Sequence, residues 1–311
     1  MDNGSDEEGG FLVFNQSRTS FAWVNRGYTI YVVHPFYVFI ERIMADKLSL
    51  FSFLYQTNIF CYVLEKNRME IIIWDDKEKK EIASIHSVAP VKALCMRNNH
   101  LIFCTESYVY IYGFPSLNFV TKYESTRNMR GLLKSSIKEK AVFAFPCGEL
   151  GAINVVDFGV DRHIITIKAH QNAINNIELS ADGDTVVTCS ERGTVIRMYE
   201  TSQGQLLREF QRSRSIADVY SMTISESRKY LVVASNKGTI HLYSLGIINN
   251  GWFSSREGST KKIYLPPENH YHCCFTRDDK YLVIIGTHKV YYRCCIDNTE
   301  GDITVAFKSC S

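Results

Sequence analysis

The sequence has no run of about 20 apolar residues, which is the length that a helix needs to cross a bilayer. The best candidate, residues 28–40, is interrupted by His34 and Pro35. The first ten residues are acidic and small, whereas a signal peptide would be basic and then apolar. We therefore expect no transmembrane segment, and a short disordered acidic tail over residues 1–10.

Signatures of catalysis and of cofactor binding are missing as well. There is no GxSxG elbow, GxxxxGKS phosphate loop, HExxH metal motif or glycine-rich dinucleotide fingerprint. The ten cysteines form no CxxC pair, and the doublets at 273–274 and 294–295 fall in strand-like runs where one of each pair would face the core. We expect a reduced, intracellular protein that is not an enzyme and holds neither a metal nor a cofactor.

Composition and charge indicate a β-protein with one basic region. Short runs of Val and Ile and an aromatic content of 13% are typical of half-buried strands, and a hydrophobic content of 45% can supply a sizeable core. Residues 191–262 hold eleven Lys and Arg against six Asp and Glu. This favours a basic face for an anionic partner, with ordinary solvated surface charge as the alternative. Because this segment contains no recognised nucleic-acid module, we do not expect a nucleic-acid partner.

A unit of about 40 residues repeats along the chain. Residues 188–199 (TCSERGTVIRMY) and 234–243 (ASNKGTIHLY) both indicate a strand, a glycine-containing turn and a second strand. Looser copies occur at 25–31, 71–75, 108–112, 151–156 and 289–292. Seven such units predict an all-β, WD40-like, seven-bladed β-propeller over residues 11–311. The regular spacing argues against a β-sandwich or two small β domains, and a longer loop around 247–262 interrupts the sixth unit.

Short segments of the sequence, in their order and spacing, resemble the PROPPIN family of phosphoinositide-binding β-propellers, whose animal members are the WIPI proteins of autophagy. The segments are 14–16, 27–31, 35–36, 73–76, 144–146 with Gly151, 168–170, 193–197, 209–210, 220–221 and 237–241. Each match is weak by itself, but their shared order covers nearly the whole chain after the acidic tail.

The family is known by a Phe-Arg-Arg-Gly motif whose two arginines point into two phosphoinositide pockets. Here the corresponding residues are Phe210, Gln211, Arg212 and Ser213, so the first arginine and the glycine are replaced. The resemblance implies that Arg212 keeps the second pocket and that Gln211 weakens the first. Arg214 would support Arg212, because residues i and i+2 of an extended segment share a side.

The resemblance also implies which residues join each pocket. Arg212 would be accompanied by Ser235, Lys237, Thr239 and His241, which alternate along one strand, turn and strand. The first pocket would be formed by Ser190, Thr194 and Arg197, with His170 as a weaker candidate. In ordinary propellers a His and a hydroxyl at such positions often brace the blade, and for His170 we prefer that role.

The loop after Leu245 corresponds to the membrane-inserting loop of the family. Its apolar residues are Ile247, Ile248, Trp252 and Phe253, and Arg256, Lys261 and Lys262 flank them. Apolar side chains can enter the acyl boundary while cations meet anionic headgroups. The alternative is a loop whose aromatic residues pack back on the propeller.

Taken as a family member, the chain is expected to be a cytoplasmic, monomeric scaffold of autophagy or endosomal traffic. It would bind phosphatidylinositol 3-phosphate and/or 3,5-bisphosphate on preautophagosomal, endosomal or vacuolar membranes, and contact autophagy proteins such as the lipid-transfer scaffold. The alternative is a protein-interaction propeller that has lost phosphoinositide binding, as the substitution at Gln211 would suggest. Liposome co-sedimentation separates the two hypotheses.

Overall fold

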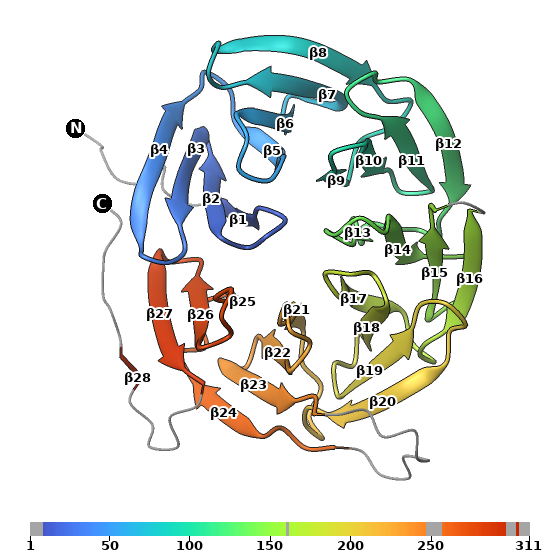
Figure 1. Cartoon of the computed structure of the whole chain (residues 1–311), viewed down its shortest axis with the longest axis vertical. Coiled ribbons are helices and arrows are strands. Elements are labelled where there is room, and N and C mark those ends of the chain that lie inside the picture. Colours follow the sequence, from blue (N-terminus) through green and yellow to red (C-terminus); the bar gives the residue numbers. More distant parts are fainter. Residues whose placement is uncertain (1–8, 160–161, 247–256, 297–302, 305–311) are drawn as a thin grey trace. The chain divides into compact units, whose positions relative to one another are not determined.

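The computed structural model of the chain describes residues 9–159, 162–246, 257–296 and 303–304. These residues form seven four-stranded sheets, each built from strands that are consecutive in sequence (Figure 1). The chain divides into two compact units, one of residues 1–106 and 110–122 and the other of residues 107–109 and 123–311. The disordered acidic tail was expected over residues 1–10, and residues 1–8 of it lie outside the described part.

The first unit contains two complete sheets and most of a third. Their strands are β1 Phe11–Phe14, β2 Ser20–Asn25, β3 Gly27–Val32, β4 Tyr37–Ile43, β5 Leu48–Phe53, β6 Ile59–Leu64, β7 Asn67–Asp75, β8 Lys80–His86, β9 Ala93–Met96, β10 His100–Cys104, β11 Tyr108–Gly113 and β12 Phe119–Glu124. The first two sheets pair antiparallel throughout and enclose a shared aromatic core that includes Tyr28, Phe51 and Phe60.

The second unit contains the remaining four sheets. Their strands are β13 Lys134–Ser135, β14 Val142–Pro146, β15 Ala152–Asp157, β16 His163–Lys168, β17 Ile174–Leu179, β18 Thr185–Ser190, β19 Val195–Glu200, β20 Leu206–Gln211, β21 Val219–Ile224, β22 Tyr230–Ser235, β23 Thr239–Ser244, β24 Lys261–Tyr264, β25 Tyr271–Phe275, β26 Tyr281–Gly286, β27 Val290–Cys295 and β28 Ile303–Thr304. All strand pairs in these sheets are antiparallel.

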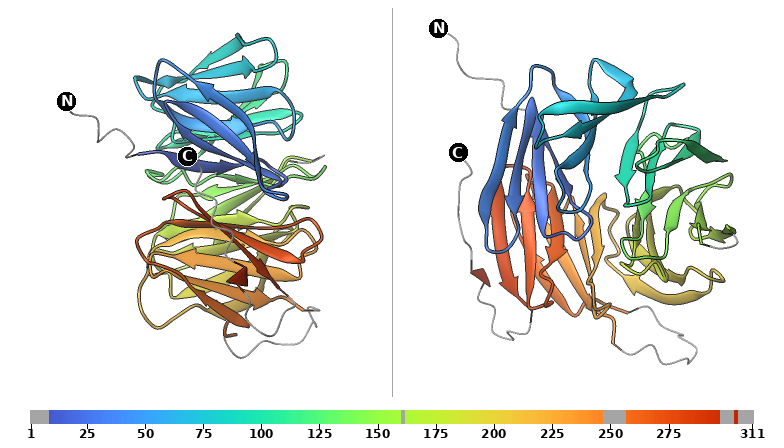
Figure 2. Two further views of the ribbon diagram at one scale, coloured as in Figure 1. Left: turned by 90° about the vertical axis from the view of Figure 1, so that its left-hand side faces the viewer. Right: turned by 45° about the horizontal axis from the view of Figure 1, so that its top comes forward.

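The expectation of an all-β chain is confirmed, because both units consist of strands and connecting loops wherever they are described (Figure 2). Each of the seven repeated segments contains or overlaps the third strand of its sheet, namely β3, β7, β11, β15, β19, β23 and β27. No helix in the described ranges is long and apolar enough to span a membrane.

The apolar core of the second unit lies between consecutive sheets. In β22, Leu231 and Val233 pack with residues of β17–β20, whereas Val232 and Ala234 pack with residues of β25–β28. Successive side chains of a strand point to opposite faces, so a strand between two cores must be apolar at nearly every position. This explains the short continuous apolar runs of the sequence.

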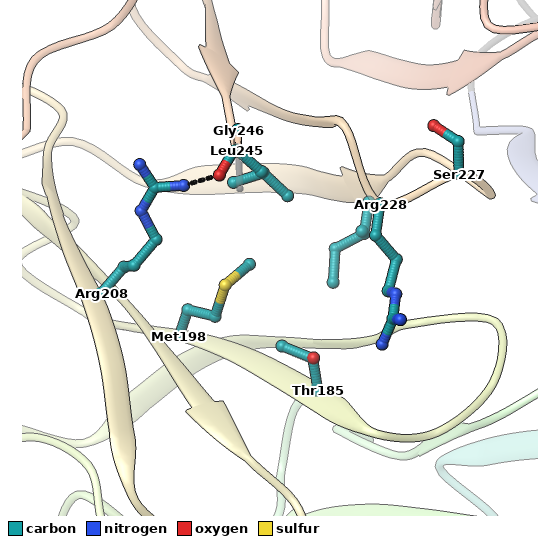
Figure 3. Close-up of a pocket in the computed structure, with 8 residues that line it drawn as sticks. Thr185, Met198, Arg208, Ser227, Arg228, Leu245 and Gly246 are labelled. Carbon is teal, nitrogen blue, oxygen red and sulfur yellow. Dashed lines mark hydrogen bonds between the residues drawn. The ribbon is translucent and has the colours of Figure 1, made fainter. Parts of the chain in front are cut away.

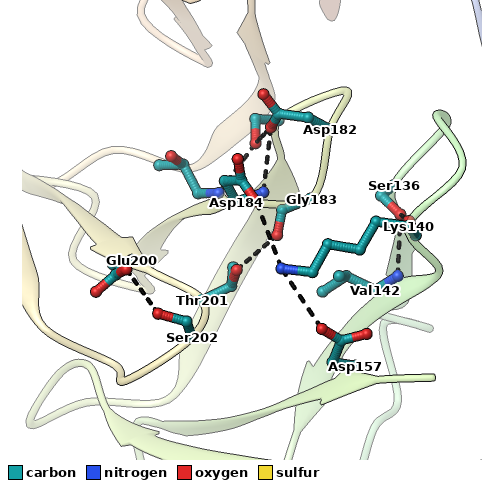
Figure 4. A network of polar contacts seen from close by, with 12 residues as sticks. Ser136, Lys140, Val142, Asp157, Asp182, Gly183, Asp184, Glu200, Thr201 and Ser202 are labelled. Carbon is teal, nitrogen blue, oxygen red and sulfur yellow. Dashed lines mark hydrogen bonds and ion pairs between the residues drawn. The ribbon is translucent and has the colours of Figure 1, made fainter. Parts of the chain in front are cut away.

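Ion pairs supplement these cores at one end of the second unit. Lys140 reaches Asp157 and Asp184, each at 3.4 Å, and Arg228 lies 3.2 Å from Asp182. Figure 4 shows the ammonium group of Lys140 between Asp157 and Asp184. It also shows the hairpin turn that carries Asp182 and Asp184. Because these side chains are 29–53% exposed, each pair contributes at most about 1 kcal/mol, and the apolar cores dominate the packing of the sheets.

A glycine before the third strand lets the chain approach its neighbour closely. Gly151, Gly193 and Gly238 have φ values of 74°, 57° and 65°. A Cβ atom there would lie between 2.0 and 2.2 Å from a backbone oxygen of the segment that leads to the next sheet. Because no residue with a side chain fits this position of the turn, glycine recurs there, and this makes the repeat visible in the sequence.

We predict that Gly151→Ala lowers the free energy of unfolding by about 3 kcal/mol, because a Cβ would meet the His170 carbonyl oxygen at 2.0 Å in a left-handed backbone conformation. The matched control is Gly258→Ala, where no atom lies within 4 Å of the added carbon. Urea denaturation should show the control within about 0.5 kcal/mol of wild type. Equal effects of both changes would contradict the proposed close approach.

Candidate functional site

Arg212 follows the last residue of β20 and is buried, with 4% of its surface exposed. Its guanidinium donates to the backbone carbonyls of Gly193 and Ser215, the latter at 2.7 Å, and to the Ser235 hydroxyl at 3.4 Å. No carboxylate of the described residues forms an ion pair with it. Burial lowers the pKa of Arg212 from its usual value, with the neighbouring Tyr243 acting in the opposite direction. A buried cation without an anionic partner is a candidate anion site.

The other predicted members of the second pocket lie on the sheet β21–β24. His241 is opposite Val233 in the register of β22 and β23, which places Ser235, Thr239 and His241 on one face of the sheet. Ser235 and His241 are buried and Thr239 is half-buried. Arg212 contacts this face through Ser235, so the predicted grouping of these residues with Arg212 agrees with the geometry.

Lys237 lies in the turn between β22 and β23 and is exposed. It forms no ion pair with any described residue, and its ammonium group can therefore meet an anion arriving from solvent. Arg214 is also exposed, but it lies beyond the extended part of β20, where the chain turns back so that Ser215 accepts a hydrogen bond from Arg212. The prediction that Arg214 supports Arg212 assumed that the strand continues to Arg214, whereas β20 ends at Gln211.

Lys262 is a site residue whose position the sequence did not predict. The sequence placed it at the flank of the loop, whereas the register of β23 and β24 places it directly opposite His241. His241 also lies 3.4 Å from the Ser259 hydroxyl through Nδ1. Burial, together with the positive charges of Arg212 and Lys262, lowers the pKa of His241 to about 4. His241 is thus neutral at pH 7, and the positive charges that act on it are those of Arg212 and Lys262.

Gln211 points to the other face of β20, toward the predicted first pocket. Its register partner is Val195, and its side-chain amide donates to the carbonyls of Thr194 and Ser213 at 3.0 and 2.5 Å. Both donors of the amide therefore have backbone partners. Adjacent residues of a strand face opposite ways, so the structure supports the expectation that positions 211 and 212 serve different spaces.

Arg197 is neutralised within the first cluster. Its guanidinium lies 2.6 Å from a Glu209 carboxylate oxygen and donates to the Ala169 carbonyl at 2.6 Å. Of the other two predicted members of this cluster, Ser190 is buried and Thr194 is half-buried. The carboxylate of Glu209 opposes binding of a further anion here. The pairing was not visible in the sequence, because Glu209 and Arg197 meet only through the register of β19 and β20.

His170 is bonded to a neighbouring hydroxyl, as expected of a brace. Its Nε2 lies 3.0 Å from Thr188 Oγ1, and both residues are buried. Burial lowers the pKa of His170 to about 4, and the charge of Arg197 contributes in the same direction.

The predicted membrane-contact residues Ile247, Ile248, Trp252 and Phe253, together with Arg256, lie outside the described residues. The described chain places their segment between the end of β23 at Ser244 and the start of β24 at Lys261. Most of the loop predicted around residues 247–262 thus falls outside the described part of the chain, and its last two residues belong to β24.

Comparison with known proteins matches a family model named PROPPIN over residues 12–270. The chain belongs to the PROPPIN family. Autophagy-related protein 18e of Arabidopsis thaliana is 26% identical over 316 residues, which cover 93% of this chain and 84% of that protein. SVP1-like protein 2 of Neurospora crassa is 28% identical over 81% of this chain, which spans only 57% of that protein. PROPPINs are known as phosphoinositide-binding, autophagy-related propellers.

Solved structures show the fold of this PROPPIN. Hsv2 of Kluyveromyces lactis with a complete loop 6CD superposes with a TM-score of 0.82 at 24% identity and covers 93% of both chains. The KlAtg21 structure, solved as a complex with the coiled-coil of AgAtg16, gives a TM-score of 0.81 at 21% identity over 93% of this chain and 95% of that one. The predicted seven-bladed β-propeller is confirmed, and the seven sheets are its blades.

We predict that the stability of this PROPPIN falls as the pH falls from 7 to 5. His170 and His241 have folded-state pKa values of about 4, whereas an unfolded histidine titrates near 6.5. Below pH 6.5 the unfolded chain therefore binds protons that the folded chain does not. Each histidine should cost about 2 kcal/mol of unfolding free energy between pH 7 and 5.

Urea denaturation at both pH values measures this effect in wild type, His170→Asn and His288→Asn. The His170 variant should show a smaller loss between the two pH values. His288 is exposed, so its variant should follow wild type. An unchanged pH dependence in the His170 variant would refute the assignment.

Proposed function

We propose that this chain is a peripheral membrane protein that binds a phosphoinositide headgroup through the Arg212 cluster, without catalysis. The observation that supports this most strongly is the buried guanidinium of Arg212, which has hydrogen-bond acceptors but forms no ion pair with a carboxylate of the described residues. A phosphomonoester carries about −1.5 to −2 charges and several acceptor oxygens. It therefore suits a planar guanidinium that is surrounded by hydroxyls and further cations.

Each member of the cluster has a role in this proposal. Arg212 supplies the forked donor, and the hydroxyls of Ser235 and Thr239 complete the hydrogen bonds to phosphate oxygens. Lys237 and Lys262 add positive charge from the exposed rim. His241 is neutral in the free protein, and a bound phosphate would favour its protonated form because opposite charges stabilise each other.

The first cluster makes a weaker contribution in our proposal. Ser190, Thr194 and Arg197 were predicted to bind a second headgroup, but Glu209 already neutralises Arg197. Gln211 cannot replace the missing charge, and its amide is bonded to two carbonyls. We therefore propose one principal pocket, with these three residues limited to secondary contacts with the membrane surface.

The remaining affinity is assigned to the segment after Leu245. Ile247, Ile248, Trp252 and Phe253 would enter the acyl boundary, since apolar burial adds roughly 25 cal/mol per Å². The ligands are phosphatidylinositol 3-phosphate and/or its 3,5-bisphosphate. The proposed locations are preautophagosomal, endosomal or vacuolar membranes, where a monomeric propeller would act as a scaffold. Family membership and the complex of KlAtg21 with a coiled-coil support autophagy proteins, including the lipid-transfer scaffold, as partners.

We predict that Arg212→Ala reduces co-sedimentation with liposomes containing phosphatidylinositol 3-phosphate by tenfold or more, because charged hydrogen bonds contribute about 1.5–3 kcal/mol each. Gln211→Ala is the matched neighbour and should change binding by less than about threefold, because its amide binds the protein's own backbone. Both variants should have the circular dichroism of wild type. Equal binding by wild type and Arg212→Ala would favour the rival hypothesis of a protein scaffold without lipid binding.

A further inference from the structure

Arg208 on β20 contacts both ends of the segment 246–256. Its Nη1 donates to the backbone carbonyl of Leu245, where the chain leaves β23, and Figure 3 shows this bond. Its Nε and Nη2 donate to the two carboxylate oxygens of Glu257 at 2.8 and 2.6 Å, where the described chain resumes. One guanidinium therefore joins the residue before the segment to the residue after it.

The backbone of Glu257 is also fixed to β20. Its amide donates to the Glu209 carbonyl at 3.0 Å, and its carbonyl accepts from the Gln211 amide at 2.7 Å. This forms a parallel bridge between Glu257 and Phe210. Glu257 thus pairs with the edge of the sheet β17–β20, although β23 and β24, between which it lies in sequence, belong to the next sheet.

We propose that Arg208 is a positioning residue that clamps both ends of the segment 246–256 to β20 and so couples this segment to the Arg212 pocket. The inference rests on the proposed function, because it assigns a role to the segment at the membrane. Arg208 lies four residues before Arg212, or about 13 Å along an extended strand. A clamp at Arg208 therefore keeps the ends of the segment at a fixed distance along β20 from the Arg212 pocket.

The contacts of Arg208 distinguish a clamp from a lipid ligand. Glu257 neutralises its charge through a bidentate pair, and only 11% of its side chain is exposed. A lipid phosphate would have to displace a carboxylate already bound in the favoured fork geometry. Fixing both ends of a chain segment in advance reduces the conformational entropy lost on binding, and this raises affinity without a new contact to lipid.

A cavity of about 300 Å³ adjoins the clamp, with Met198, Ile224 and Leu245 among its walls (Figure 3). Arg208 borders this space, so truncating its side chain enlarges an existing cavity. Arg228 lines the same cavity, but its partners are Asp182 and Asp184 in a hairpin turn, at 3.2 and 3.6 Å. Arg228 is thus a matched control with the same charge, the same cavity and no contact with the segment ends.

The clamp itself is tested without lipid by amide hydrogen exchange at Gln211 and Glu257. In Arg208→Ala and in Glu257→Ala, exchange of the Gln211 amide should be at least about tenfold faster, which corresponds to about 1.4 kcal/mol of lost protection. The Arg228→Ala control should exchange as wild type does. Wild-type exchange in the Arg208 and Glu257 variants would overturn the clamp.

The coupling is tested by comparing a soluble headgroup, inositol 1,3-bisphosphate, with liposomes containing phosphatidylinositol 3-phosphate. Arg208→Ala should bind the soluble headgroup with an unchanged Kd and liposomes about tenfold more weakly. The double variant Arg208→Ala with Glu257→Ala should match the single variants, because both changes break the same pair. Exchanging the partners, Arg208→Glu with Glu257→Arg, should restore part of the liposome binding.

Two results would overturn the coupling. Liposome binding of Arg208→Ala equal to that of wild type would show that the clamp does not act on the membrane-bound state. A parallel loss of headgroup and liposome binding, with additive effects in the double variant, would show a general structural role. A wild-type chain that binds neither ligand would overturn the proposed function and the coupling together, whereas the exchange experiment would still decide the clamp.

Discussion

Neighbouring residues of an extended strand point to opposite faces, and the candidate site depends on this geometry at the end of β20. Gln211 faces the cluster that contains Arg197, whereas Arg212 reaches Ser235 on the adjacent sheet. Phe210 packs into the core shared with β21–β23, whereas Glu209 and Gln211 lie on the opposite face with Arg197. A replacement at position 211 therefore removes a cation from one space and leaves the other unchanged. The two clusters can diverge in function although one chain segment supplies both.

Charge compensation separates the arginines around this strand. Arg197 is paired with Glu209 and Arg208 with Glu257, so these two guanidinium groups serve the protein's own structure. Arg212 donates to two carbonyls and one hydroxyl, and these neutral acceptors leave its charge in place. Burying an uncompensated charge opposes folding. A ligand that supplies the missing negative charge would recover part of this cost, which is why Arg212 is the centre of the proposed site.

The sequence predicted those features that local chemistry determines. Glycine turns such as Gly193 and Gly238 exclude side chains, so the repeat and hence the propeller could be read from the chain. The alternation of Ser235, Thr239 and His241 likewise followed from strand periodicity. Contacts across strands could not be predicted in this way. The position of Lys262 opposite His241 depends on where β24 resumes after the segment 246–256, and the pairing of Arg197 with Glu209 depends on the register of β20.

The clamp at Arg208 addresses a difficulty that a single pocket creates. With one buried arginine and two exposed lysines, the electrostatic attraction to a headgroup is limited, and salt screens the exposed part within about 8 Å at physiological ionic strength. In the proposed function apolar contacts supply the rest, and fixing the conformation of a chain segment costs roughly 1–2 kcal/mol of conformational entropy per residue. Arg208 contacts the residues on both sides of the segment 246–256, and in our proposal these contacts reduce the entropy that membrane binding costs. Since the clamp and the pocket share β20, the apolar residues and Arg212 would then reach the membrane together.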